Sequence, residues 1–287
     1  MWKGIDVSDN QGAINWAQIH KNVDFAILRS VRRSGKADHQ FSANLEGCRK
    51  RNIPMSVYKY TYAATPEAAR QEAQQVVVLL QSYGLTGTMV WWDVEDKDVL
   101  RPLGAAKLTE CIRAAQEVIT AAGYSFGLYV GLYVYNECWF DFNAFSGTRL
   151  WVARYYKGYR TMLFADEPDQ SYKPPVDRWL TVWQYTSCGE IAGIKGDVDL
   201  NISYEDPAAW TQHVAESGVI YTVSVVDTRS GRGYSAATCA SGSLRRGAQS
   251  TNIGVKKRPG VLRRTGLFFD EAVGFSLTYF KIVFIEK

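Results

Sequence analysis

The sequence has few of the residues that bind metal ions or build disulfide frameworks. Its 287 residues include three histidines, none of them paired at metal-ligand spacing and none in an HExxH motif. The five cysteines are scattered, odd in number and without a CxxC pair. These absences argue against a zinc amidase, a zinc ribbon and a disulfide scaffold, so we expect no metal and no other cofactor.

Long apolar runs and nucleotide-binding motifs are also missing. No stretch approaches the roughly 18 consecutive apolar residues of a membrane span, and the N-terminal stretch MWKGIDVSDNQG lacks the layout of a secretory signal. There is no P-loop, dinucleotide fingerprint or GxSxG elbow. We therefore expect no membrane span, no export signal, and neither a nucleotide-dependent enzyme nor a serine hydrolase.

Basic residues are concentrated late in the chain. Residues 218–287 hold eleven Lys and Arg against four Asp and Glu, so residues 1–217 have a net charge of −3 although the whole chain has +4. Residues 229–266 are rich in Gly, Ser and Arg, which is typical of a segment that does not fold alone. We predict one domain over residues 1–217 and a low-complexity tail over residues 218–287. The tail is either a disordered extension or a segment that binds an anionic polymer, and we expect no nucleic-acid partner.

Eight short runs of apolar, β-branched and aromatic residues predict strands. They are residues 3–8, 24–30, 55–62, 88–95, 125–131, 149–155, 180–186 and 197–201. Apolar residues at helical spacing predict helices from Thr65-Pro66 to Gly84 and from Leu108 to Ala122. Strands that alternate with helices favour a parallel sheet, and eight of them favour closure into a (β/α)8 barrel.

The predicted barrel is irregular and TIM-like, with some helices missing. About 215 residues is near the short end for a (β/α)8 barrel. Residues 162–178 are acidic and interrupted by proline, and the link over residues 189–196 is too short for a helix. We expect loops to hold the second half of the barrel and a last helix to form over residues 208–217.

Carboxylates stand where several predicted strands end, which is where a parallel barrel builds its active site. Asp6 ends the first strand, Asp93 and Glu95 end the fourth, and Asp199 lies in the eighth. Side chains alternate along a strand, so Asp93 and Glu95 face the same way, and Asp6 should meet Asp199 because the first and eighth strands of a barrel are neighbours. Converging carboxylates raise the pKa of at least one of them, which suits a general acid at neutral pH. The plainer alternative is that these are loop acids that face water.

Aromatic side chains are placed near the same predicted strand ends. Tyr60 and Tyr62 belong to the third strand, Tyr129 to the fifth, and Trp183 with Gln184 to the seventh. Flat apolar faces with polar rims suit sugar rings. We predict that these five residues bind substrate, although most aromatic rings in such a barrel fill its core. Tyr62, at a strand end, is the strongest candidate among them.

These motifs resemble the glycoside hydrolase family 25 lysozymes. The similarity runs from GIDVSDNQG through FAILRS, SVYKYTYA, VWWDVE and LWVARY to WQYTSCGEIAGIKGDVDLN, in the family's order over residues 4–201. The resemblance implies an irregular barrel that lacks some helices. It also implies an enzyme that hydrolyses the β-1,4 bond between N-acetylmuramic acid and N-acetylglucosamine in bacterial peptidoglycan.

The resemblance also implies roles for the four acids. Glu95 looks like the general acid that protonates the leaving oxygen, and Asp93 like the partner that stabilises positive charge or the acetamido group of the substrate. Asp6 and Asp199 look like supporting carboxylates. Spacing alone does not say which of Asp93 and Glu95 holds the proton. Because a substrate-assisted route is proposed for the family, the spacing of the pair predicts no stereochemistry.

Two other functions are compatible with a barrel of this kind. A catalytically inactive barrel could bind wall glycans, but Asp6, Asp93, Glu95 and Asp199 are all present. A chitinase-like enzyme of another family would more typically carry a DxxDxDxE strand, which VWWDVEDKD lacks. The resemblance therefore favours a lysozyme that acts on the cell wall, either as a phage lysin released through holin-made holes or by non-classical export.

The tail resembles a LysM wall-binding module in part. YTVSVVDTRSG, residues 221–231, is similar to the opening of such a module, and RPGVLRR, residues 258–264, to its end. The apolar and Asn positions needed between them are absent. A degenerate LysM-like module and a chance similarity both remain open at this point.

Overall fold

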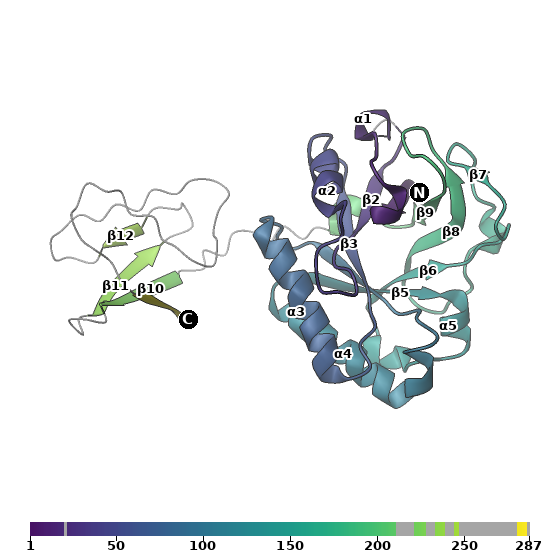
Figure 1. Ribbon diagram of the computed structural model, residues 1–287. Coiled ribbons are helices and arrows are strands. Elements are labelled where there is room, and N and C mark those ends of the chain that lie inside the picture. The colour runs from purple at the N-terminus through teal and green to yellow at the C-terminus, as the bar shows by residue number, and fades with distance from the viewer. Residues whose placement is uncertain (20–21, 211–220, 228–232, 239–243, 247–279, 286–287) are drawn as a thin grey trace. The chain divides into compact units, whose positions relative to one another are not determined.

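A computed structural model describes residues 1–19, 22–210, 221–227, 233–238, 244–246 and 280–285. The chain divides into two compact units, Met1–His213 and Val214–Lys287, which are described separately (Figure 1). Within the described residues, no helix is long and apolar enough to cross a membrane.

The first unit is a closed barrel of eight strands (Figure 1). These strands are β1 (Trp2–Val7), β2 (Phe25–Arg29), β3 (Met55–Tyr60), β4 (Met89–Asp93), β5 (Ser125–Gly131), β6 (Arg149–Ala153), β8 (Leu180–Glu190) and β9 (Val198–Ser203). Each of β1 to β6 pairs with the next, β6 pairs with β8, and β9 closes the barrel between β8 and β1. The short strand β7 (Met162–Leu163) pairs with the end of β8. The predicted irregular barrel is confirmed.

The last barrel strand runs opposite to its neighbours. Strands β1 to β6 and β8 pair in parallel, whereas β9 is antiparallel to both β8 and β1. The prediction of an all-parallel barrel was wrong here, because the link between β8 and β9 is too short for the crossover that a parallel strand requires. Strand β9 therefore begins at the end of the barrel where β1 ends.

Five α-helices are present in the described part of the chain. They are α1 (Trp16–Ile19), α2 (Phe41–Arg49), α3 (Pro66–Ser82), α4 (Ala105–Ala121) and α5 (Leu132–Asn136). The predicted helices correspond to α3 and α4, which lie side by side on the outside of the barrel (Figure 1). Thr65 caps α3, its hydroxyl accepting the backbone N–H of Ala68 at 3.2 Å.

Short 3-10 turns occupy several links between these elements. They are η1 (Asp9–Gln11), η2 (Arg101–Leu103), η3 (Phe142–Phe145), η4 (Gln170–Tyr172) and η5 (Pro207–Trp210). No α-helix forms over residues 162–178 or 189–196, as expected. The helix predicted over residues 208–217 overlaps η5 at its start, and its remainder lies outside the described residues.

Alternation along the strands sorts the buried side chains into two layers. The barrel interior holds Phe25, Ile27, Met89, Trp91, Tyr129, Trp151, Ala153, Val182 and Trp210. A larger outer layer, to which Val90, Trp92 and Val94 belong, packs between the strands and the helices. A Cβ atom at Gly127 would lie 2.5 Å from the Trp91 ring, so a glycine on β5 leaves room for that ring. The face of β4 that holds Trp91 is the face that continues to Asp93.

The second unit contains a four-stranded antiparallel sheet. Its strands are β10 (Tyr221–Asp227), β11 (Gly233–Thr238), β12 (Leu244–Arg246) and β13 (Phe280–Ile285), in the order β12-β11-β10-β13. Strand β10 falls in the first LysM-like stretch, and β11 and β12 fall in the predicted low-complexity segment. The second LysM-like stretch, residues 258–264, lies outside the described residues.

Candidate active site

The four predicted acids lie at one end of the barrel. Asp6 stands near the end of β1, Asp93 is the last residue of β4, and Glu95 follows two residues later. Asp199 is the second residue of β9, and it lies directly opposite Asp6 in the antiparallel register. The reversed direction of β9 is what brings its first residues to the ends of the parallel strands.

Asp6 is held by two amide side chains in the barrel interior. It is 5% exposed, and its Oδ2 accepts hydrogen bonds from Asn201 Nδ2 at 2.8 Å and from Gln184 Nε2 at 2.9 Å. Asn201 is fixed in turn by Trp151, whose Nε1 donates to Asn201 Oδ1 at 2.9 Å. Burial raises the pKa of Asp6 to about 6, and the two amide hydrogen bonds limit the rise.

Gln184 links the acid on β1 to the hydroxyls of two tyrosines. Its Oε1 accepts hydrogen bonds from Tyr129 at 2.8 Å and from Tyr155 at 2.7 Å, while its Nε2 donates to Asp6. With both ends of the amide used, the orientation of the Gln184 side chain is fixed. Gln184 and Tyr129 are both buried, and these hydrogen bonds fix the groups around Asp6.

Asp93 and Glu95 differ in how they meet solvent. Asp93 is 3% exposed, and its Oδ1 is buried with no hydrogen-bond partner in the described part of the chain. Glu95 is partly exposed, and the Tyr133 hydroxyl donates to its backbone oxygen at 3.0 Å. Asp93, the last residue of β4, is on the same face of the strand as Trp91, whereas Val94 packs in the outer layer.

The acids raise one another's pKa values. Burial is the largest cause for Asp93, whose pKa lies well above its usual range, and the charges of Glu95 and Asp6 add to the rise. Burial also raises the pKa of Asp199 well above its usual range, followed by the charges of Asp6 and Glu95. The pKa of Glu95 is raised to about 7 by burial and by the charge of Asp6, and a hydrogen bond with Tyr129 limits the rise. At neutral pH the group therefore retains protons, which an acid catalyst requires.

Tyr60 and Tyr62 stand beside Asp93 at the end of β3. Tyr60 pairs with Asp93 in the register of β3 and β4, and the backbone N–H of Thr61 donates to the backbone oxygen of Asp93 at 3.0 Å. The rings of Tyr60 and Tyr62 are 4.7 Å apart between centroids, and both side chains are partly exposed. Both rings are thus available to a ligand that reaches the acids.

The model of Glycosyl hydrolases family 25 matches residues 5–194, which is more than half of the chain and spans β1 to the end of β8. The chain belongs to glycosyl hydrolase family 25. A curated relative, Lysozyme M1 of Streptomyces globisporus, is 24% identical over 220 residues, which is 69% of this chain and 66% of that protein. This family 25 chain thus spans just under two thirds of the length of that relative.

Solved structures of lysins share the barrel. The catalytic domain of endolysin ply40 from bacteriophage P40 of Listeria monocytogenes is 26% identical, with a TM-score of 0.58, over 73% of this chain and 96% of that chain. The bacterial lysozyme from Streptomyces coelicolor is 21% identical, with a TM-score of 0.56, over 75% of this chain and 98% of that chain. These similarities agree with an irregular barrel as the fold of this family 25 member.

Trp183 does not point toward the four acids of the family 25 barrel. It is fully buried in the outer layer, where its Nε1 donates to the Arg154 backbone oxygen at 3.0 Å. Trp183 is predicted beside Gln184 among the substrate-binding residues, but on β8 it is Val182 and Gln184 that face the interior. Trp183 therefore has no part in the candidate site.

Sequence reasoning missed three residues of the site. Asn201 lies two residues after Asp199 and so on the same face of β9, a spacing that could have identified it. Tyr155 comes from the link after β6 and Tyr133 from α5, which follows β5 directly, and neither carries a motif of its own. Only the folded barrel brings these two hydroxyls to Gln184 and Glu95.

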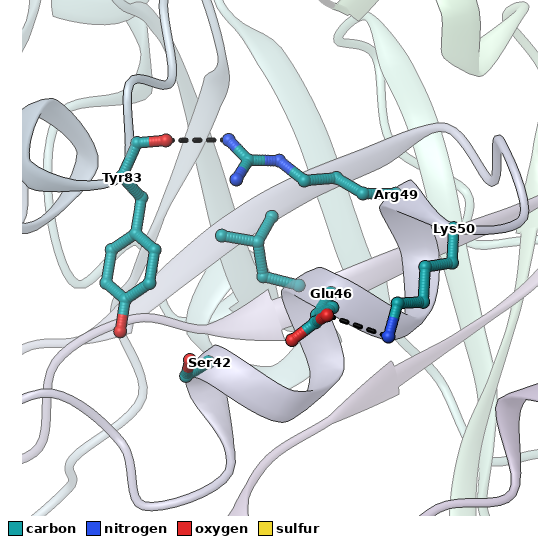
Figure 2. Close-up of a pocket in the computed structure, with 6 residues that line it drawn as sticks. Ser42, Glu46, Arg49, Lys50 and Tyr83 are labelled. Atoms are coloured by element: carbon teal, nitrogen blue, oxygen red, sulfur yellow. Dashed lines mark hydrogen bonds and ion pairs between the residues drawn. The ribbon is translucent and has the colours of Figure 1, made fainter. Parts of the chain in front are cut away.

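A separate hollow on the outer surface has no link to this chemistry. Figure 2 shows it between α2 and the end of α3, with Glu46 paired to Lys50 at 2.7 Å and Arg49 donating to the Tyr83 backbone oxygen at 2.7 Å. The charged groups that line it satisfy one another and include none of the four acids. Over the residues that the structure describes, no group of His, Cys, Asp and Glu is arranged to hold a metal ion.

Proposed function

We propose that this family 25 protein is a lysozyme, which hydrolyses the β-1,4 bond between N-acetylmuramic acid and N-acetylglucosamine in bacterial peptidoglycan. Family membership supports the reaction class, and the names of Lysozyme M1 and endolysin ply40 support the cell wall as the substrate. The observation that carries the proposal is the partly exposed Glu95, with a pKa of about 7, beside three further carboxyl groups.

Glu95 serves as the general acid. Such a group must hold a proton at the working pH and must also reach the oxygen of the departing sugar. Asp93 and Asp199 also hold protons, but Asp93 is enclosed in the barrel, and the choice of Glu95 over the partly exposed Asp199 follows the family resemblance. Glu95 meets both requirements, because burial and the charge of Asp6 hold its pKa near neutrality while its side chain stays partly exposed.

Asp93 acts on the sugar that carries the bond to be broken. Its Oδ1 has no partner among the described residues, although a buried carboxyl oxygen without a hydrogen bond is costly. A substrate group that supplies this missing contact removes the cost on binding. The acetamido group of the sugar, whose N–H can donate to this oxygen, is the partner that fits a carboxyl group held without charge.

Asp6 and Asp199 support Glu95 and Asp93 from the opposite side of the barrel end. The charge of Asp6 helps to raise the pKa of Glu95, and the hydrogen bonds from Asn201 and Gln184 hold Asp6 in place. Tyr60 and Tyr62 offer their rings to the sugars, while Tyr129 and Gln184 act behind them as positioning residues.

The wall is also the expected location and partner. The routes that fit such an enzyme are release through membrane holes, as for a phage lysin, and non-classical export. Residues 218–287, with eleven basic and four acidic residues, supply a positive segment that attracts an anionic wall. Wall retention by charge is the role that we assign to the second unit.

Replacement of the two central acids tests the proposal. Glu95→Gln keeps the shape of the side chain but removes the transferable proton, so clearing of purified peptidoglycan should fall at least about a hundredfold. Asp93→Asn should also lose most of the activity. Glu46→Gln on α2 removes an exposed carboxylate far from the site and should clear the wall at the normal rate. A Glu95→Gln protein that is folded and still clears peptidoglycan would refute the assignment.

A further inference from the structure

Arg33 lies over the ring of Tyr62. Its guanidinium carbon is 4.4 Å from the centroid of the Tyr62 ring, which is the geometry of a cation–π contact. Arg33 itself is exposed and belongs to the link between β2 and α2. A guanidinium that stacks on a ring keeps the N–H groups along its edge free to bind an anion with two parallel hydrogen bonds.

Three cationic side chains near Arg33 already have partners, namely those of Arg29 at the end of β2 and of Arg32 and His39 on the link. Arg29 lies 3.7 Å from Asp9, and Arg32 donates to the Ala37 backbone oxygen at 3.0 Å. His39 contacts Asp9 at 2.8 Å. Arg33, by contrast, makes no ion pair with any residue that the structure describes. Lys36 on the same link is also exposed and makes no ion pair with a described residue, but of these cations only Arg33 lies over Tyr62, so its charge is held at that ring and is available to a ligand.

A line of side chains connects Arg33 to the catalytic acids. The Tyr62 ring under Arg33 is 4.7 Å from the Tyr60 ring, and the Tyr60 hydroxyl donates to Asp96 Oδ2 at 3.3 Å. Asp96 directly follows Glu95 in the chain. The stacked guanidinium therefore stands at one edge of the surface on which a sugar beside Glu95 would lie.

We propose that Arg33, held on Tyr62, binds a carboxylate of the peptide that muramic acid carries in peptidoglycan. The inference rests on the proposed function and identifies the peptide carboxylate as the group of the polymer that the site recognises. Muramic acid bears its peptide on a lactyl ether, and that peptide carries free carboxylates, whereas the two N-acetyl sugars are neutral. Asp6, with a pKa of about 6, is mostly ionised at neutral pH and repels an anion at the barrel end, whereas Arg33 attracts one. The charge pattern therefore places the neutral sugars at Glu95 and the peptide at Tyr62.

The test compares two forms of the same peptidoglycan. One is untreated, and in the other the peptide carboxylates are converted to amides, which leaves the glycan chains unchanged. The native protein should prefer the untreated form, mainly through a lower KM. Arg33→Gln should reduce this preference, measured as the ratio of kcat/KM on the two substrates, by about three- to tenfold at low salt. The difference should shrink as salt is added, because the contact is exposed to solvent.

Arg113→Gln is the matched control. Arg113 is another exposed arginine beside an aromatic ring, 5.9 Å from the centroid of Phe145, but it lies on α4 at the outer surface. Its replacement should leave the substrate preference unchanged. An equal effect of the Arg33 and Arg113 replacements, or a native protein that cleaves both substrates equally, would overturn the inference. Loss of cleavage in Glu95→Gln would still uphold the proposed function in that case, so the two failures are distinguishable.

Discussion

At the scale of single residues, the site is governed by carboxyl groups that burial keeps protonated. Glu95 has a pKa raised to about 7, so it is mostly protonated below that pH and loses its proton above it. A general acid works only in the protonated form. We expect kcat/KM for peptidoglycan to fall by about tenfold per pH unit once the pH is well above 7.

Initial rates of reducing-end release, measured at constant ionic strength across this range, check the prediction. A rate that stays level from neutral to clearly alkaline pH would contradict the role of Glu95.

We expect the buried carboxyl group of Asp93 to lower the free energy of unfolding at neutral and alkaline pH. Its pKa is raised in the folded protein, so the folded state holds this proton more tightly than the unfolded chain does. Stability is therefore lost as the pH rises above the unfolded value of about 3.9, and it continues to fall until the folded-state pKa is passed. Asp93→Asn carries no charge at any pH and should be more stable than the native protein by about 1–3 kcal/mol near pH 8.

Thermal unfolding near pH 8 and near pH 4 measures this effect, which should disappear at the lower pH. Asp169 is a control of opposite sign, because hydrogen bonds from Ser171 lower its pKa. Asp169→Asn should therefore lose rather than gain stability near pH 8. An Asp93→Asn protein that is less stable than the native one at both pH values would contradict a buried Asp93 with a raised pKa.

Alternation along a strand predicted the acids but could not assign every side chain to a face. Asp93 and Glu95 were predictable because they are two residues apart on a strand that begins in the core. Trp183 and Gln184 are adjacent and cannot both point inward, and the composition of β8 did not decide between them. The pairing of β8 with β6 and β9 decides it, and both pairings contain register shifts that no local pattern records.

At the scale of elements, a buried ion pair braces the end of β3 against α3. Lys59 is fully buried, and its ammonium lies 3.5 Å from Glu72 Oε2. The same carboxylate accepts a hydrogen bond from the Thr61 hydroxyl at 2.6 Å and another from the backbone N–H of Tyr62 at 3.2 Å. One carboxylate on α3 thus fixes the turn that presents Tyr60 and Tyr62.

Removal of Glu72 should be strongly destabilising. Glu72→Ala leaves the buried Lys59 ammonium without a negative charge beside it, although its hydrogen bond to the Tyr60 backbone oxygen remains, and we expect a loss of about 2–4 kcal/mol in the free energy of unfolding. Glu67→Ala on the same helix removes an exposed partner of Arg70 and should change it by no more than about 0.5 kcal/mol. Urea unfolding of the two variants provides the comparison. Equal losses of free energy would show that the buried pair contributes no more to stability than the exposed pair of Glu67 and Arg70.

The direction of β9 shows what strand patterns leave open. The run DVDLN predicted a strand and placed Asp199 beside Asp6, but a run of residues does not state its own direction. The length of the link before it holds that information, because a link too short for a helix excludes the crossover that a parallel strand requires. With β9 antiparallel, Asp199 reaches the active end of the barrel from the start of its strand instead of its end.

At the scale of the whole molecule, the chain combines a barrel of net negative charge with a basic second unit. Removal of residues 218–287 should weaken retention on purified cell walls at low salt while the bond that is cleaved stays the same. Co-sedimentation with walls, repeated at high salt, separates charge from specific recognition. Equal retention of the full and shortened chains at low salt would remove any targeting role from this unit.

The chemical identity of the cleaved ends tests the central claim most directly. Purified peptidoglycan is digested with the full chain, the new reducing ends are converted to sugar alcohols with borohydride, and the alcohols and any new free amines are quantified. The account predicts that muramitol accumulates, with no rise in free amines, and that the Glu95→Gln protein releases none. New ends that are glucosaminitol, or free amines without new reducing ends, would contradict it.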